Sequence, residues 1–145
     1  MDKLRVGILG LGRGFTHLKN FLALEEVEVI GACDRFPLLR ERAQEPIAAA
    51  KSSTPILEEF DQLLALAPDA IMVATNGKLQ VDHACQALDA GCHVLSEVPG
   101  AHTQEECMRL RATVEYTGKT YMLAENTCYW DFFRYFRKWV AKDLF

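Results

Sequence analysis

A glycine-rich turn constrains the fold of this chain more than any other feature of the sequence. Gly10, Gly12 and Gly14 directly follow the apolar run LRVGIL at 4–9, and an amphipathic segment begins immediately after them. A strand, a tight turn and a helix N-terminus in this order present free backbone N–H groups, which a bound phosphate requires. The pattern is imperfect, because the position of the usual third glycine is taken by Phe15. A turn that only connects strand to helix therefore stays an alternative.

Short apolar runs alternate with helical patterns along the rest of the chain. After 4–9, strands are expected at 27–33, 54–57, 70–75, 92–96 and 120–124. This alternation is typical of βαβ units and predicts an α/β fold with a parallel sheet.

Helix boundaries carry their own sequence signals. Pro37 suits the first turn of a helix, and Pro46 is expected to split that helix. Thr103 and Glu106 have the spacing of a capping box. In the helix that follows, Cys107 is expected to lie on the buried face.

An acidic residue ends the second expected strand. Asp34 follows the glycine turn at roughly the 20-residue spacing at which dinucleotide-binding folds hold a ribose-binding carboxylate. Such a carboxylate accepts hydrogen bonds from ribose hydroxyls and repels a 2′-phosphate, so NAD is expected to bind in preference to NADP. Arg35 complicates this expectation, because it can stack on adenine or meet a phosphate. Asp34 as a solvated loop residue or helix cap is the alternative.

Composition excludes several classes of protein. The chain has 145 residues, 50% of them hydrophobic, and a formal net charge of −4, which argues against a nucleic-acid-binding protein. No apolar run is long enough to span a membrane, and the first residues do not resemble a signal peptide. Five scattered cysteines, never spaced as C-x-x-C, indicate a cytoplasmic protein without a disulfide framework or zinc site. The four histidines show no ligand spacing, and His17 is expected to play a polar packing role.

The sequence resembles the N-terminal domain of the glucose–fructose oxidoreductase / inositol dehydrogenase / MocA superfamily. The resemblance rests on VGILGLGRGFTH, ACD, DAIMVAT, HACQALDAGCHVLSEVP and TGKTYMLAEN, which occur in this order over residues 4–126. It implies an NAD(P)-binding domain of the Rossmann type at 1–126, an α/β fold with a doubly wound parallel sheet in the order 3-2-1-4-5-6. The segment 127–145 would then lead into a second α/β substrate domain, at whose start the chain is expected to stop.

The same resemblance implies one cofactor site along the carboxyl ends of the strands. The pyrophosphate would be lined by Gly10, Gly12, Arg13, Gly14 and Phe15. The adenosine end would be held by Asp34 and Arg35. The crevice after the fourth strand would contribute Thr75 and Asn76, and the nicotinamide side Glu97 and Asn126. A plain strand-ending turn is the alternative for Thr75 and Asn76, and a structural hydrogen-bond acceptor is the alternative for Glu97.

One departure from the family pattern bears on the chemistry. The family usually has Glu-Lys-Pro where this chain has Glu97, Val98 and Pro99. The family's lysine moves the proton that accompanies hydride transfer, and valine has no proton to give. No catalytic residue is therefore assigned within this chain. The altered motif resembles NAD-dependent glycoside hydrolases of the superfamily, which transfer a hydride transiently and return the cofactor to its starting state.

Three functions remain open at this point. The first is the NAD(P)-binding domain of an oxidoreductase acting on sugars or polyols, the second a redox-assisted glycosidase, and the third a non-catalytic nucleotide-binding module. The aromatic and basic segment 129–145 is expected to form an amphipathic helix whose apolar face packs on a further domain. With that face uncovered, association between copies of the chain is expected.

Overall fold

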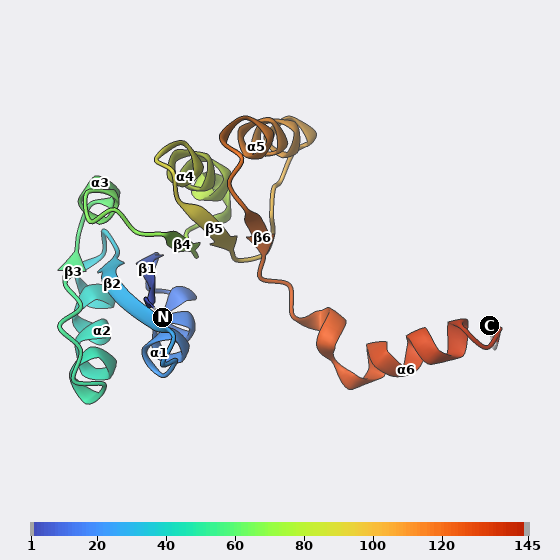
Figure 1. Cartoon of the computed structure of the whole chain (residues 1–145), viewed down its shortest axis with the longest axis horizontal. Helices are drawn as coiled ribbons and strands as arrows, with labels where there is room; N and C mark the ends of the chain where they lie inside the picture. Colours follow the sequence, from blue (N-terminus) through green and yellow to red (C-terminus); the bar gives the residue numbers. More distant parts are fainter. Residues whose placement is uncertain (1, 144–145) are drawn as a thin grey trace.

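The computed structural model describes residues 2–143 and consists of a six-stranded sheet between two layers of helices (Figure 1). The strands are β1 (Leu4–Leu9), β2 (Val27–Cys33), β3 (Ile56–Leu57), β4 (Ala70–Val73), β5 (His93–Ser96) and β6 (Tyr121–Leu123). Their order is β3-β2-β1-β4-β5-β6, and all neighbouring pairs are parallel. The Rossmann-type order predicted from the sequence is confirmed.

Five helices connect successive strands and cover both faces of the sheet. They are α1 (Gly14–Leu22), α2 (Pro37–Ala49), α3 (Phe60–Leu64), α4 (Gly77–Asp89) and α5 (Gln104–Thr117), and a further helix, α6 (Asp131–Val140), follows the last strand. In Figure 1, α1 and α2 lie on one side of the sheet, and α3, α4 and α5 lie on the other. Two separate clusters of buried side chains fill the spaces between the sheet and these helix layers.

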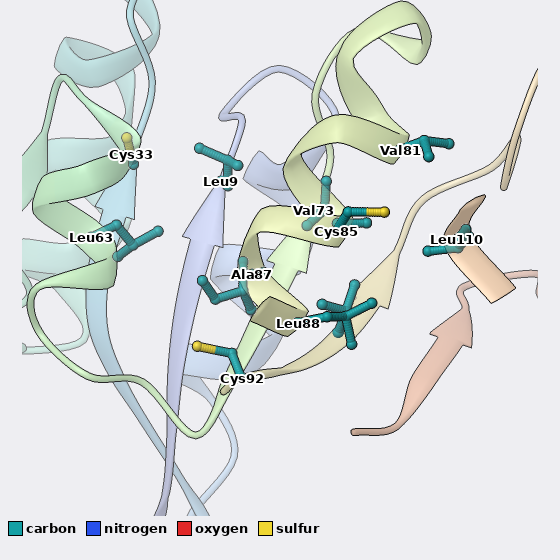
Figure 2. Close-up of a cluster of buried hydrophobic side chains, with 13 residues drawn as sticks. Leu9, Cys33, Leu63, Val73, Val81, Cys85, Ala87, Leu88, Cys92 and Leu110 are labelled. Carbon is teal, nitrogen blue, oxygen red and sulfur yellow. The ribbon is translucent and has the colours of Figure 1, made fainter. Parts of the chain in front are cut away.

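The cluster under α4 shows how the pattern of apolar residues builds the core (Figure 2). Val81 and Leu88 of α4 belong to this cluster, and Leu88 is fully buried. Val73 of β4 is also fully buried, as expected for a central parallel strand covered on both faces. Each such side chain contributes about 1.5–3 kcal/mol when it is completely removed from water.

Two local expectations were wrong. Helix α2 continues through Pro46, because this residue lies near the helix end and Ile47 beside it is buried with Ala43 against the sheet. Cys107 is exposed, and the buried residue of α5 is Leu110. The capping box of Thr103 and Glu106 is confirmed.

Helix α6 extends away from the sheet (Figure 1). Its large exposed apolar side chains are Phe132, Phe133, Tyr135, Phe136, Trp139 and Val140. The helix predicted in this segment is present, whereas its docking on a further domain stays a prediction. Within residues 2–143, no helix combines the length and apolar character needed to cross a membrane.

Candidate functional site

The carboxyl ends of β1, β2 and β4 meet where the strand order reverses between β1 and β4. Ligands bind at this position in open parallel α/β sheets. A cavity of about 360 Å³ opens there. Of the predicted site residues, those that line it are Gly10, Gly12, Asp34, Arg35, Thr75 and Asn76.

The glycine turn leaves room for a ligand. Gly10 has a φ of +90°, and a Cβ atom there would lie 2.5 Å from the carbonyl oxygen of Ala74. Gly12 faces open space, since the nearest atom to a Cβ at that position would be 4.0 Å away. Gly14 is buried where α1 packs on the sheet. A Cβ atom added at Gly14 would lie 3.2 Å from the Cβ of Ala74. The early third glycine therefore still permits close helix–strand packing.

Asp34 is buried and links the glycine turn to the end of β2. Its Oδ2 accepts a hydrogen bond of 2.7 Å from the Leu11 N–H, and its Oδ1 accepts one of 2.9 Å from the Phe36 N–H. A carboxylate oxygen can accept more than one hydrogen bond. Both oxygens can therefore still accept hydrogen bonds from a ligand in the cavity.

The other wall of the cavity is built around the start of α4. Asn76 is the N-cap, and its side chain accepts a hydrogen bond from the Lys78 N–H. Thr75 Oγ1 lies 3.0 Å from His83 Nδ1, and the His83 ring meets Phe60 edge-on at 5.5 Å. Burial lowers the pKa of His83 and so favours its neutral form.

Several residues of this cavity were not found from the sequence. Glu58, Glu59, Phe60, Leu79 and His83 also line it. The first three follow β3, which is only two residues long. The signal that could have found them is the rule that the carboxyl end of every parallel strand faces the crevice.

A second polar cluster surrounds Glu97, after β5. His17 Nε2 of α1 lies 2.8 Å from Glu97 Oε1, and Arg13 Nε lies 3.3 Å from the same oxygen. The Val98 N–H donates to Oε2. Glu97 is buried, whereas the Arg13 side chain is 74% exposed. His17 is therefore the stronger partner, since ion pairs with exposed side chains contribute little.

This cluster determines the ionisation of Glu97. Burial alone would raise its pKa, but the hydrogen bonds from His17 and Val98, together with the charges of His17 and Arg13, lower the pKa below its ordinary value. A lowered folded-state pKa contributes stability that is present above the unfolded value, near 4.5, and is lost as the pH falls through the folded value.

We expect His17→Ala to destabilise the fold by about 1–3 kcal/mol at neutral pH, because it leaves a buried carboxylate with one good partner fewer. The difference from the unchanged protein should shrink in acid, below pH 4.5, as Glu97 becomes protonated in both proteins. Urea unfolding across this pH range measures the effect. The control is His102→Ala, which changes an exposed histidine. An equal loss of stability at both ends of the range would contradict the interpretation.

The remaining predicted residues lie outside the cavity lining. The Phe15 ring packs under the Arg42 guanidinium at 3.9 Å. Asn126 is exposed at the start of a short 3₁₀ helix (Thr127–Tyr129), and Val98 is 45% exposed. Among residues 2–143, no group of three or more His, Cys, Asp or Glu side chains is arranged to hold a metal ion.

Curated relatives cover most of this chain. It is 31% identical over 136 residues to glycosyl hydrolase family 109 protein 2 of Akkermansia muciniphila, a match over 89% of the chain and 29% of the relative. It is 34% identical to an alpha-N-acetylgalactosaminidase of Shewanella oneidensis, over 89% of the chain and 30% of that protein. The chain thus spans about three tenths of the length of these relatives.

Solved structures share the fold. The scyllo-inositol dehydrogenase of Lactobacillus casei with bound NAD(H) and scyllo-inositol superposes with a TM-score of 0.83 at 23% identity, over 97% of this chain and 42% of the other. The WlbA dehydrogenase of Bordetella pertussis in complex with NADH and UDP-GlcNAcA gives the same values. The family described as oxidoreductases with an NAD-binding Rossmann fold matches residues 4–125. The chain therefore belongs to the Gfo/Idh/MocA oxidoreductase family and forms its NAD-binding Rossmann domain.

Proposed function

We propose that the cavity binds the adenosine and pyrophosphate parts of NAD(H) in preference to NADP(H). The observation that carries this proposal is the buried Asp34 carboxylate, which lies in the cavity beside the glycine turn. The residues fit the cofactor, because Gly12 leaves open the space that a side chain would fill, and the first turn of α1 carries no acidic residue. A helix N-terminus whose own first turn lacks acidic residues favours a bound pyrophosphate.

The proposed contacts follow from the cavity lining. Gly10 and Gly12 with the start of α1 bind the pyrophosphate, and Arg13, Gly14 and Phe15 support that turn. Asp34 accepts hydrogen bonds from the ribose hydroxyls, and Arg35 covers the adenine. The crevice wall is formed by Thr75 and Asn76, and the nicotinamide side by Glu97 and Asn126. When bound, NAD(H) supplies a ring that accepts or donates a hydride.

Calorimetric titration of the chain with NADH and with NADPH tests the proposed preference. We expect NADH to bind at least tenfold more tightly, because a 2′-phosphate beside the Asp34 carboxylate adds about 1.4 kcal/mol or more of unfavourable interaction. Equal or tighter binding of NADPH would contradict the role of Asp34. It would indicate instead that Arg35 binds the 2′-phosphate.

For the whole protein we propose hydride chemistry on a sugar or polyol. The scyllo-inositol and UDP-GlcNAcA bound in the two dehydrogenase structures support this substrate class. A redox-assisted glycosidase is the second candidate. It is favoured by Val98 in place of the family's lysine and by the glycosyl hydrolase names of the curated relatives. The exposed aromatic side chains of α6 support association between copies, and the buried free thiols of Cys33, Cys85 and Cys92 support a cytoplasmic location.

Turnover by the whole protein separates these candidates from a non-catalytic module, and the 145-residue chain alone tests the role of Val98. We expect the 145-residue chain to bind NADH and to show no net reduction of NAD with sugars or polyols. A positioned acid or base supplies roughly 10²–10⁴-fold of rate, and Val98 cannot act as one. NADH absorbance across a panel of polyols and aldoses, beside aglycone release from aryl glycosides, measures both activities. Substrate-specific reduction of NAD by this chain would contradict the expectation.

A further inference from the structure

An ion pair lies at the edge of the cavity, next to the proposed ribose site. Arg40 of α2 approaches Glu58, which follows β3, with 3.1 Å between Nη2 and Oε2. The same guanidinium donates a hydrogen bond of 2.8 Å from Nη1 to the main-chain oxygen of Asp34. The Arg40 side chain is 20% exposed and the Glu58 side chain 57% exposed. These contacts hold the guanidinium of Arg40 close to the residue whose carboxylate we assign to the ribose hydroxyls.

The Arg40 guanidinium has the chemistry of a phosphate ligand. It is permanently charged and carries five N–H donors in a planar fork that suits phosphate oxygens. In this structure, the main-chain oxygen of Asp34 accepts a hydrogen bond from one terminal nitrogen of the guanidinium. The Glu58 carboxylate binds the other terminal nitrogen and neutralises the positive charge. Glu58 is one of the residues that line the cavity. The Glu58 carboxylate thus occupies the arm of the guanidinium that a phosphate oxygen could otherwise bind.

The charges of the cavity lining do not replace Arg40, which contacts this lining at Asp34 and Glu58. Asp34, Glu58 and Glu59 are the acidic residues of its lining, and Arg35 is the basic one. Arg35 is exposed, and its guanidinium lies against the Phe36 ring, 4.9 Å from the ring centre. A 2′-phosphate at the ribose would therefore meet a site whose fixed charges are mainly negative.

We propose that Glu58 is a second determinant of cofactor choice, which excludes NADP(H) by holding Arg40 in an ion pair. Removal of the Glu58 carboxylate would then free the Arg40 guanidinium to bind a 2′-phosphate. This inference rests on the proposed binding of NAD(H) in the same cavity. It makes discrimination depend on two carboxylates, with Asp34 repelling the phosphate directly and Glu58 withholding its partner.

The test compares NADH and NADPH binding to the unchanged chain, to Glu58→Gln and to Glu58→Gln with Arg40→Gln. We expect Glu58→Gln to lower the ratio of the NADPH to the NADH dissociation constant by about five- to tenfold, the effect of one gained hydrogen bond between a charged donor and a partly exposed phosphate. The double variant should return the ratio to that of the unchanged chain. Raising the salt concentration should weaken the gain for NADPH, because the new contact is ionic.

A matched control removes the same charge elsewhere. Glu45→Gln changes an exposed carboxylate on α2 and should leave the ratio unchanged. Thermal unfolding of each variant verifies that it is folded before titration.

Two outcomes would overturn the inference while leaving the proposed function in place. The first is an unchanged ratio in Glu58→Gln. The second is a lowered ratio that persists in the double variant, since Arg40 would then not be the ligand. Failure of the unchanged chain to bind NADH would instead refute the proposed function, and the inference with it.

Discussion

Gly10→Ala is expected to destabilise the protein strongly and to abolish NADH binding. At a φ of +90° any L side chain is strained. The added Cβ would also lie 2.5 Å from the backbone oxygen of Ala74, the residue that follows β4. Backbone atoms cannot move aside as a flexible side chain can. We expect a loss of roughly 3–5 kcal/mol in the free energy of unfolding, because backbone strain and a steric clash act together. Urea unfolding and NADH titration measure the two effects.

Gly91→Ala is the matched control for this substitution. Gly91 has nearly the same φ, +88°, but no neighbouring atom lies within 4 Å of a Cβ built there. It therefore carries the backbone strain without the clash, about 1–2 kcal/mol. Because Gly91 precedes β5 at the opposite end of the sheet, NADH binding should survive. Equal destabilisation by the two substitutions would show that the contact between the glycine turn and β4 is not tight.

The sheet could be predicted because its signals are local. The apolar runs at Leu4–Leu9 and Val27–Cys33 became β1 and β2 with the expected bounds. The course of α2 around Pro46 could not be predicted from the sequence. Burial of Ile47 against the sheet outweighs the hydrogen bond that a proline near the helix end cannot make. Tertiary packing of this kind leaves no trace in local spacing.

The candidate site could be predicted only where one chain segment carries the whole signal. The glycine turn and Asp34 belong to a pattern of fixed spacing, so both could be found. The pairs His17–Glu97 and Arg40–Glu58 join separate elements, and their members are far apart in the chain. One sequence cannot show which distant charges meet, because that depends on strand order and helix orientation. The structural role of Asp34 could not be predicted for the same reason. Its carboxylate accepts a hydrogen bond from the Leu11 N–H and so holds the glycine turn, which is distant in the chain.

Asp34→Ala is accordingly expected to affect both stability and cofactor binding. It leaves the N–H groups of Leu11 and Phe36 without their acceptor. Each lost bond to a carboxylate is worth about 1.5–3 kcal/mol before water compensates, so a net loss of roughly 2–4 kcal/mol in stability is expected. NADH affinity should fall by about tenfold or more, because a charge-assisted bond to the ribose is lost and the glycine turn is no longer held.

Asp69→Ala separates the two consequences. The Asp69 carboxylate also accepts a backbone hydrogen bond, from the Arg5 N–H at 2.8 Å, but it lies before β4, at the amino end of that strand. It should reduce stability and leave the NADH dissociation constant unchanged once the folded fraction is taken into account. Asp34→Ala should raise that constant even in the folded fraction. If both variants lowered only stability, Asp34 would have a structural role alone, as the acceptor that holds the glycine turn. Ribose binding would then have to come from another side chain of the cavity.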